Sequence, residues 1–319
     1  MQIKKKYTWL VTGAAGFVGS NLVERLLKEN QKVIGIDNFI TGKKKNIYNL
    51  KRLSNSSNFK FIRGDIKNRD FVNNVTKKID FVLHNAALGS VNRSIKYPEQ
   101  SFDNNVFGFF NILNAAKDNK VKKFIYASSS SVYGDSASLP KKELFIGKAL
   151  SPYATTKYIN EELAYIYSKT YKLETVGLRY FNVFGKNQDP ESIYAAVIPK
   201  WIDLLKKNKT LKIFGDGKNS RDFCYVANVV EACILVSLKK LKNKFNIYNV
   251  ACGERISLIK LSRILNKLFN ENKKLKIRFS NPRKGDIKHS IASIKKISDE
   301  LGYSPKFNVV DGLRELKDL

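Results

Sequence analysis

One short segment of this chain carries the residue types best suited to move a proton. It reads Ser-Pro-Tyr-Ala-Thr-Thr-Lys over residues 151–157. Ser151 is a favourable N-cap and Pro152 a favourable first helical residue, so the pattern predicts a helix that begins here. Tyr153 and Lys157 then lie four residues apart on one helical face. A phenol has a reference pKa of about 10, and a neighbouring ammonium would lower it and help the phenol to act as a base.

A run of four serines precedes this segment in the chain. Ser128–Ser131 ends a predicted strand, and its hydroxyls can bind a substrate oxygen. By itself a serine run is more often a loop, and a tyrosine–lysine pair at this spacing is more often an ordinary surface pair. In combination, the two segments predict a Ser/Tyr/Lys set for proton transfer.

A glycine-rich turn follows the first predicted strand. Gly13, Gly16 and Gly19 form a GxxGxxG pattern where that strand gives way to a helix. Such a turn lets a pyrophosphate approach the backbone amides at a helix N-terminus. Asp37 ends the second predicted strand and can accept hydrogen bonds from both ribose hydroxyls of an adenosine, while it would repel a 2′-phosphate. The pattern therefore predicts a site for NAD rather than NADP.

The ends of two later strands add candidates for the same site. Asp65 follows the third predicted strand and is placed to contact an adenine. Asn85, Ala86 and Ala87 follow the fourth, and the small side chains would let a cofactor pass close to the sheet edge. Ligands of open α/β sheets bind at these carboxyl ends of strands.

Strand-like and helical segments alternate over residues 1–178, which predicts a doubly wound parallel sheet of the Rossmann type with α/β class. We expect this part to be the NAD-binding domain with the Tyr/Lys helix. Strands are expected at 7–12, 32–37, 59–63, 80–84, 123–128 and 174–178. Helices are expected at 16–28, 68–76, 98–119 and 152–169.

The pattern loosens over residues 179–319, which predicts a smaller C-terminal α/β lobe that binds substrate. The boundary is soft, because a later strand can return to the main sheet. Helices are expected at 195–206, 226–239, 258–269 and 291–301, and a short strand at 212–214.

Composition narrows the class of protein. The net charge is +30, but the basic residues are scattered and no nucleic-acid-binding signature accompanies them. We expect a solvated basic surface, with steering of an anionic substrate as a weaker alternative and no nucleic-acid partner. No apolar stretch approaches the roughly 18 residues that span a bilayer, so no membrane partner is expected. Three cysteines without a CxxC pair, and only two histidines, predict reduced thiols and no metal site. Glycines interrupt the apolar run near the N-terminus, so it is not a signal peptide, and a cytoplasmic protein is expected.

These motifs together resemble the extended short-chain dehydrogenase/reductases over nearly the whole chain. The resemblance implies that Tyr153 removes a hydroxyl proton while a sugar carbon gives a hydride to NAD. It further implies that Lys157 tunes this phenol and holds the nicotinamide ribose, and that Ser129 bonds the reacting oxygen. Relatives are usually homodimers, joined through helices around 104–117 and 153–169. The implied cofactor contacts are Gly13, Gly16, Phe17, Val18, Asp37, Asn38, Gly42, Asp65, Ile66, Ala86, Ala87, Asn104, Tyr153, Lys157 and Tyr180.

The segment after the serine run separates reaction types within this family. Members that eliminate water or carbon dioxide carry a carboxylate there, whereas this chain reads Ser-Ser-Ser-Val-Tyr-Gly over 129–134. Proton transfer beyond the oxidised carbon then lacks its usual agent. The remaining chemistry is oxidation at C4, rotation of the keto sugar and return of the hydride to its other face. This is epimerisation, with no net change in NAD.

Further segments resemble the UDP-hexose 4-epimerases, and most of all the bacterial UDP-N-acetylglucosamine 4-epimerases of O-antigen pathways. They are residues 84–91, 178–185, 215–217, 220–225 and 283–286. By this resemblance, Asn182 contacts the sugar or phosphate, Arg221 and Arg283 pair with the diphosphate, and Asp286 pairs with the uridine ribose. A guanidinium fork also suits phosphate oxygens on physical grounds.

The resemblance bears on sugar preference through one wall of the hexose pocket. A large aromatic residue at that position crowds out an N-acetyl group, and here the position is Ser290. UDP-GlcNAc and UDP-GalNAc are therefore the expected substrates. The uronic acid forms, UDP-glucose, a dehydratase, decarboxylase or reductase reaction, and a silent NAD-binding protein stay as alternatives. The implied substrate contacts are Gly89, Ser90, Ser129, Ser130, Asn182, Ala196, Val197, Trp201, Arg221, Arg283, Asp286 and Ser290.

Overall fold

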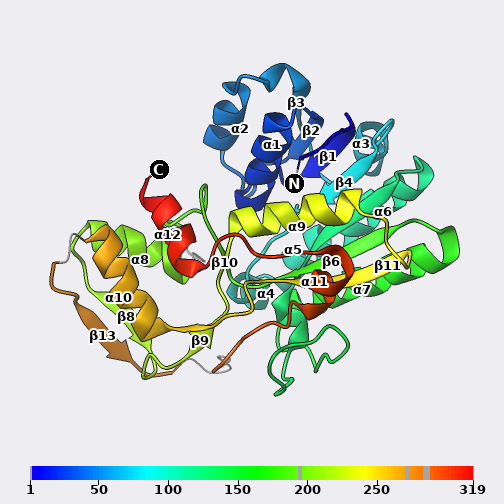
Figure 1. Ribbon diagram of the computed structural model, residues 1–319. Coiled ribbons are helices and arrows are strands. Elements are labelled where there is room, and N and C mark those ends of the chain that lie inside the picture. Colours follow the sequence, from blue (N-terminus) through cyan, green and yellow to red (C-terminus); the bar gives the residue numbers. More distant parts are fainter. Residues whose placement is uncertain (1, 193–195, 271–272, 283–287, 319) are drawn as a thin grey trace. The chain divides into compact units, whose positions relative to one another are not determined.

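The computed structural model describes residues 2–192, 196–270, 273–282 and 288–318 (Figure 1). The chain divides into two compact units, each built from separate parts of the sequence. Residues 230–248 belong with the N-terminal residues, although they follow the soft boundary expected at 178. The first unit is Met1–Ser136, Ile146–Arg179 and Val230–Tyr248, and the second is Ala137–Phe145, Tyr180–Val229 and Asn249–Leu319.

A seven-stranded sheet in the order β11-β6-β5-β4-β1-β2-β3 organises the first unit, which confirms the predicted Rossmann-type α/β fold. The pairs β1–β2, β2–β3, β1–β4 and β4–β5 are parallel, with Thr12 opposite both Ile36 and His84. β11 is the late strand that returns to this sheet, beside β6. The strands are β1 (Thr8–Thr12), β2 (Lys32–Asp37), β3 (Phe59–Arg63), β4 (Phe81–His84), β5 (Lys123–Ser129), β6 (Thr175–Tyr180) and β11 (Phe245–Val250).

Helices connect these strands, and α7 begins where its sequence predicts. The Ser151 hydroxyl accepts a hydrogen bond from the Ala154 amide at 3.1 Å, and Pro152 is the first helical residue. The helix ends at Lys172, whose φ of 58° is left-handed. The helices are α1 (Phe17–Lys28), α2 (Lys44–Lys51), α3 (Arg69–Val75), α4 (Val91–Lys96), α5 (Pro98–Phe102), α6 (Gly108–Asp118), α7 (Pro152–Tyr171) and α9 (Val226–Leu238), with short 3-10 turns at Ser56–Asn58 and Ser130–Tyr133.

The single helix expected over 98–119 is interrupted. A π-helical turn, Asp103–Phe107, separates α5 from α6. Within it, the Asn105 side chain accepts a hydrogen bond from the Leu88 amide at 2.7 Å and donates one to the Thr156 hydroxyl at 3.2 Å. Such turns form where a side-chain contact enters a helix, and they are frequent at functional sites. The interruption thus ties this helix to the segment after β4 and to α7.

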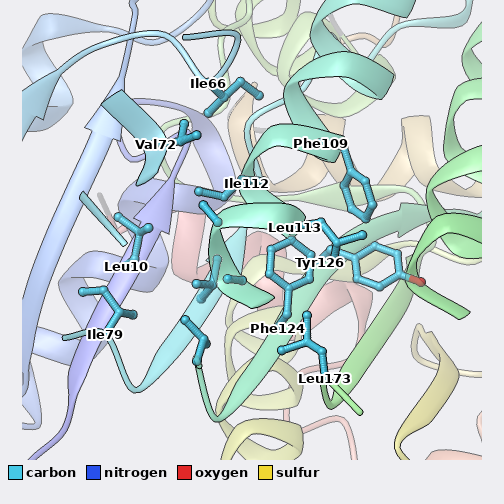
Figure 2. Close-up of a cluster of buried hydrophobic side chains, with 14 of the residues drawn as sticks. Leu10, Ile66, Val72, Ile79, Phe109, Ile112, Leu113, Phe124, Tyr126 and Leu173 are labelled. Carbon is cyan, nitrogen blue, oxygen red and sulfur yellow. The ribbon is translucent and has the colours of Figure 1, made fainter. Parts of the chain in front are cut away.

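Apolar side chains from several elements gather on one face of the sheet (Figure 2). Phe109 of α6 packs edge-on against Phe124 and Tyr126 of β5, with ring centroids 5.6 and 5.2 Å away. In Figure 2 the Tyr126 hydroxyl points away from the cluster, and this buried oxygen has no partner among the described residues. Gly177 on β6 leaves it room, because a β-carbon there would lie 2.6 Å from the oxygen. The packing fixes α6 over β5, the strand that ends in the serine run.

The second unit contains short paired strands and further helices. Strands β7–β10 and β8–β13 are parallel pairs, and β9–β12 is antiparallel. The helix expected over 291–301 begins only at Lys295, because Ala292 forms a bridge with Lys141 and donates its amide to Asp222 at 3.2 Å. The elements are β7 (Val183–Phe184), α8 (Val197–Lys206), β8 (Leu211–Phe214), β9 (Ser220–Arg221), β10 (Cys224–Tyr225), β12 (Ile256–Ser257), α10 (Leu258–Phe269), β13 (Ile277–Ser280), α11 (Lys295–Leu301) and α12 (Val309–Lys317). In neither unit is a described helix long and apolar enough to cross a membrane.

Candidate active site

The glycine turn between β1 and α1 is packed so closely that side chains are excluded. Gly13 has a φ of +69°, and a β-carbon there would lie 2.9 Å from the Ala86 nitrogen at the end of β4. The Gly16 amide donates to the Gly13 carbonyl at 2.9 Å. Gly16 is also the N-cap of α1 and provides no capping side chain. The helix therefore presents its first amides, Phe17 and Val18 among them, in the manner of an anion site.

Asp37 lies beside this turn, as its predicted role requires. Its carboxylate accepts hydrogen bonds from the amides of Ala15 at 3.0 Å and Phe39 at 2.7 Å. A β-carbon on Gly42 would lie 2.7 Å from the same carboxylate. Burial raises the pKa of Asp37, and these backbone hydrogen bonds oppose the rise. The arrangement aims a fixed carboxylate at the space next to the glycine turn.

The remaining cofactor candidates lie in the first unit, except Tyr180, which is the last residue of β6 and belongs to the second unit. Asn38 donates to the Asp65 carboxylate at 3.1 Å, which joins the ends of β2 and β3. Ile66 is buried and packs where a side chain on Gly108 would stand. Asn104 is buried in the π turn and donates to the Gln100 carbonyl at 2.8 Å.

A buried Thr12–His84 pair supports the ends of β1 and β4, and the sequence reasoning assigned it no role. The Thr12 hydroxyl accepts hydrogen bonds from the amides of Asn85 at 3.2 Å and Ala86 at 3.1 Å. Its own proton therefore goes to Nδ1 of His84, 2.8 Å away. Burial, followed by the charge of Lys157, lowers the pKa of His84 to about 3. His84 is thus neutral, with its proton on Nε2.

The structure brings Ser129, Tyr153 and Lys157 together. A side-chain hydrogen bond joins Ser129 to Tyr153, and the Lys157 ammonium lies 6.0 Å from the centre of the Tyr153 ring. The Ser129 oxygen also accepts hydrogen bonds from the Ser131 amide at 3.1 Å and hydroxyl at 2.9 Å. The Tyr153 amide donates to the Ser94 hydroxyl at 3.0 Å, which anchors the first turn of α7.

Burial dominates the acidity of both members of the Tyr/Lys pair. It raises the pKa of Tyr153, and the hydrogen bond from Ser129 opposes this rise. It lowers the pKa of Lys157 to about 8, and the charge of Glu161 opposes the fall. The Lys157 ammonium donates to the Ala127 carbonyl at 2.7 Å and is only 2% exposed. Burial therefore disfavours the charged form of each group, the phenolate of Tyr153 and the ammonium of Lys157.

A buried ion pair lies behind this set, and the sequence reasoning missed it. The Arg179 guanidinium of β6 binds the Glu161 carboxylate of α7 through Nε at 2.9 Å and Nη2 at 2.7 Å. The Ser128 hydroxyl donates to the same carboxylate at 2.5 Å. The signal was present, because Glu161 is one helical turn beyond Lys157 on the same face.

In the first unit, the substrate candidates flank the proton-transfer set along the chain. Gly89 is exposed with open space around its α-carbon. Ser90 caps α4 and accepts a hydrogen bond from the Arg93 amide at 3.1 Å. Ser130 is half-buried in the turn after Ser129.

In the second unit, Arg221 and Ser290 lie on adjoining segments. The Ser290 amide donates to the Ser220 carbonyl at 3.0 Å, and the Arg221 guanidinium donates to that same carbonyl at 3.0 Å. Asn182 donates to the backbone carbonyl of Asp222 at 3.1 Å. These three candidates are therefore joined by hydrogen bonds to one short stretch of chain.

Asp222 organises that stretch, which the sequence reasoning also missed. Its fully buried carboxylate accepts hydrogen bonds from the amides of Cys252 at 3.0 Å, Gly253 at 3.1 Å and Ala292 at 3.2 Å. One side chain thus ties together three segments that are far apart in sequence. Nothing in the order of residues around Asp222 indicates these partners.

The other second-unit candidates differ in exposure. On α8, Trp201 is buried and Val197 half-buried, while Ala196 is exposed just before the helix. Arg283 and Asp286 lie outside the described residues. Among the described residues, no group of three or more His, Cys, Asp or Glu side chains is placed to hold a metal ion.

Comparison with known proteins gives a consistent result. The model of the NAD dependent epimerase/dehydratase family matches residues 9–251. The structure is similar to the UDP-N-acetylglucosamine 4-epimerase of Methanobrevibacter ruminantium M1 in complex with UDP-N-acetylmuramic acid, with a TM-score of 0.91, 36% identity and 98% of each chain covered.

Two further solved structures are similar over the same extent. The UDP-glucuronic acid 4-epimerase of Bacillus cereus, in complex with UDP-glucuronic acid and NAD, has a TM-score of 0.89 and 35% identity, with 98% of each chain covered. The UDP-glucose 4-epimerase of Thermotoga maritima, with UDP-glucose, has a TM-score of 0.89 and 30% identity, covering 98% of this chain and 97% of the other. The similarity therefore extends over three different hexose substrates.

Proposed function

The chain belongs to the NAD-dependent epimerase/dehydratase family, and from this premise we propose that it interconverts UDP-GlcNAc and UDP-GalNAc. The reaction class, 4-epimerisation of a UDP-sugar with NAD, agrees with the similar epimerases of UDP-glucose, UDP-N-acetylglucosamine and UDP-glucuronic acid. The observation that supports the reaction is the Ser129–Tyr153–Lys157 set. Residues 130–134, which follow Ser129, contain no carboxylate that could act as a further acid or base.

The residues around the glycine turn fit NAD. A β-carbon at Gly13 would lie 2.9 Å from the Ala86 nitrogen, so only glycine lets the turn pack this closely against the end of β4, and the Asp37 carboxylate is held by backbone amides beside it. We propose that Gly13, Gly16 and the first turn of α1 hold the pyrophosphate and that Asp37 holds the adenosine ribose. When bound, NAD supplies the acceptor of the C4 hydride and the source of its return.

The proton-transfer set then handles the proton of the C4 hydroxyl. Tyr153 accepts this proton, while Ser129 donates a hydrogen bond to the reacting oxygen. The charge on Lys157 stabilises the phenolate. After the keto sugar has rotated so that its other face receives the hydride, Tyr153 returns the proton to the oxygen of the epimer. The cycle is balanced, because the hydride and the proton that leave C4 and its oxygen both come back.

Small side chains support the preference for N-acetylated sugars. Ser290 is the wall position and is held by backbone hydrogen bonds next to Arg221. A β-carbon on Gly89 would meet nothing within 4 Å apart from its chain neighbours. An N-acetyl group needs such space.

The decisive experiment is incubation of the purified protein with UDP-GlcNAc without added cofactor, followed by analysis of the sugar nucleotides. UDP-GalNAc should form and reach equilibrium, faster than UDP-galactose forms from UDP-glucose or the galacturonate from UDP-glucuronate. Steady NADH production, loss of water or release of carbon dioxide would contradict epimerisation. A clear preference for UDP-glucose or UDP-glucuronate would contradict the choice of sugar alone.

We also propose a homodimer joined through α5, α6 and α7. Large apolar side chains are exposed on these helices and on the π turn between α5 and α6, and α6 contacts α7 where Phe110 meets Tyr167. Light scattering on the purified protein tests this, because a monomer at micromolar concentration would exclude it. The exposed residues are Phe102, Phe107, Phe110, Tyr158, Tyr165, Ile166 and Tyr171. A cytoplasmic location, expected from the sequence, and a supply of nucleotide sugars for surface polysaccharide, implied by the resemblance, complete the proposal.

A further inference from the structure

The ion pair between Glu161 and Arg179 is buried on both sides. Each side chain is only 4% exposed, and the two are joined by a bidentate contact. The Arg179 guanidinium also stacks over the Tyr133 ring, 4.9 Å from its centre. Removing two charges from water costs several kcal/mol per ion, so a buried pair is weak evidence for a role in stability alone. Its position therefore needs another explanation.

The partners of Glu161 come from the elements that carry the proton-transfer set. Ser128, which donates to Glu161, lies between Ala127 and Ser129 on β5. Ala127 provides the carbonyl that binds the Lys157 ammonium. Glu161 itself lies one turn beyond Lys157 on α7. Glu161 therefore belongs to the helix that carries Lys157, while its carboxylate is bonded to the strand that carries Ser129.

The ionisable groups that interact electrostatically with Lys157 or with Glu161 leave Glu161 as the counter-charge of Lys157. His84 on β4 is neutral, since its pKa is about 3, and burial keeps the Tyr126 phenol on β5 protonated by raising its pKa. Arg179 on β6 is cationic. On α7, Tyr153 is the group to be deprotonated. Among these groups, Glu161 is the anion, and its charge opposes the loss of the Lys157 proton.

We propose that Glu161 is a positioning residue of the proton-transfer set: held by Ser128 and Arg179, it fixes α7 against β5 and keeps the buried Lys157 cationic. The proposal rests on the proposed function, in which a charged Lys157 stabilises the Tyr153 phenolate. It gives Glu161 no contact with substrate or cofactor.

The first test follows the proton of Lys157 directly and needs no substrate. Lysine carrying 13C at its ε-carbon is titrated by NMR, and the Lys157 signal is identified by its loss in Lys157→Met. We expect Glu161→Gln to lower the midpoint of this titration by about one pH unit or more. An unchanged midpoint in a folded variant would overturn the proposal. Because activity is not measured, this result is independent of whether UDP-GlcNAc is the substrate.

The chain offers a matched control in a second ion pair on β5, whose lysine is buried and whose glutamate is half-buried. Lys123 at the start of the strand contacts Glu174 at 2.9 Å, with side chains 6% and 19% exposed. Glu174→Gln also leaves a buried cation without its carboxylate, but at the opposite end of β5 from Ser129. It should leave the midpoint for Lys157 unchanged. A shift as large as that of Glu161→Gln would mean that any lost ion pair disturbs the site, and would overturn the specific role.

A double variant separates the charge of Glu161 from its partnership with Arg179. Glu161→Gln with Arg179→Met removes both charges, so no guanidinium is left unpaired. We expect it to fold if the single variant does not, while the alkaline limb of kcat still lies at lower pH than in the wild type, with KM changed less than twofold. Recovery of the wild-type pH profile would show that Glu161 only neutralises Arg179, which overturns the proposal. Absence of turnover in the wild type would instead count against the proposed function.

Discussion

Thr12 of β1 donates its hydroxyl proton to Nδ1 of His84 on β4 over 2.8 Å, because two backbone amides already occupy its oxygen as an acceptor. The contact holds the carboxyl ends of two neighbouring strands at the place where the glycine turn begins. It works only while His84 is neutral, since a protonated imidazole would present a second N–H to the hydroxyl.

This relationship predicts a dependence of stability on pH. The unfolded chain binds a proton at His84 near pH 6.5, whereas the folded chain does so only near pH 3. His84 therefore does not reduce the free energy of unfolding above pH 6.5. As the pH falls from 6.5 toward 3, protonation of the unfolded chain at His84 lowers the free energy of unfolding by about 1.4 kcal/mol per pH unit. His84→Asn, whose amide oxygen can replace Nδ1 as acceptor, should remove this part of the slope. Urea unfolding at several pH values measures it.

The second histidine provides the control for this experiment. His289 contacts the Ser220 hydroxyl at 2.9 Å in the other unit and is half-buried. His289→Asn leaves the Thr12–His84 contact intact and is compared with His84→Asn in the same unfolding series. Equal slopes for the wild type and His84→Asn would show that His84 is not the group responsible.

A second prediction concerns the phenol of Tyr153. Tyr153→Phe keeps the ring beside Lys157 but removes the group that accepts the substrate proton. We expect kcat to fall by about 10²- to 10⁴-fold, as for the loss of a general base, with the affinity for NAD kept within about threefold. Tyr48→Phe is the control, because Tyr48 is exposed on α2, outside the proposed dimer interface. Residual turnover close to that of the wild type would assign the base elsewhere.

A third prediction concerns the choice of cofactor. Asp37→Asn keeps the shape of the side chain but removes the charge that binds ribose hydroxyls and repels a 2′-phosphate. The Kd for NAD should rise by roughly ten- to hundredfold, the usual worth of hydrogen bonds to a charged group, and the preference for NAD over NADP should shrink. Binding is measured by calorimetry on protein freed of nucleotide. Asp70→Asn, an exposed carboxylate on α3, should change neither value.

Local patterns predicted the parts of this molecule that depend on neighbouring residues. The start of α7 follows from Ser151 and Pro152 alone, and the strand, glycine turn and helix around Gly13 follow from a short run of sequence. The parallel sheet follows from the alternation of such segments. Each of these features is decided within about a dozen residues, which is why a single sequence was sufficient.

Long-range contacts decided the features that the sequence did not predict. The π turn depends on Asn105 reaching Leu88, and the late start of α11 depends on the bond from Ala292 to Asp222. Neither contact has a sequence signature, because the partners are brought together only by the fold. Glu161 is different: its spacing from Lys157 was visible, but only the structure shows that Arg179 and Ser128 hold it.

The last prediction concerns the sugar. Ser290 is only 9% exposed, and its amide is fixed on the Ser220 carbonyl, so a larger side chain there cannot turn freely out of the way. Ser290→Tyr should therefore fill space that the N-acetyl group needs. We expect kcat/KM for UDP-GlcNAc to fall at least about tenfold, which corresponds to about 1.4 kcal/mol, while that for UDP-glucose changes less.

The comparison of the two sugars on one variant separates crowding from damage. A misfolded variant would lose both activities, whereas a crowded pocket loses only the larger substrate. Ser290→Ala is the matched control, since it keeps the space in the pocket and removes only the hydroxyl. Ser290→Ala should retain the preference for UDP-GlcNAc. Equal losses for both sugars in Ser290→Tyr, in a protein with unchanged thermal unfolding, would remove Ser290 from the wall of the pocket and leave sugar preference to other residues.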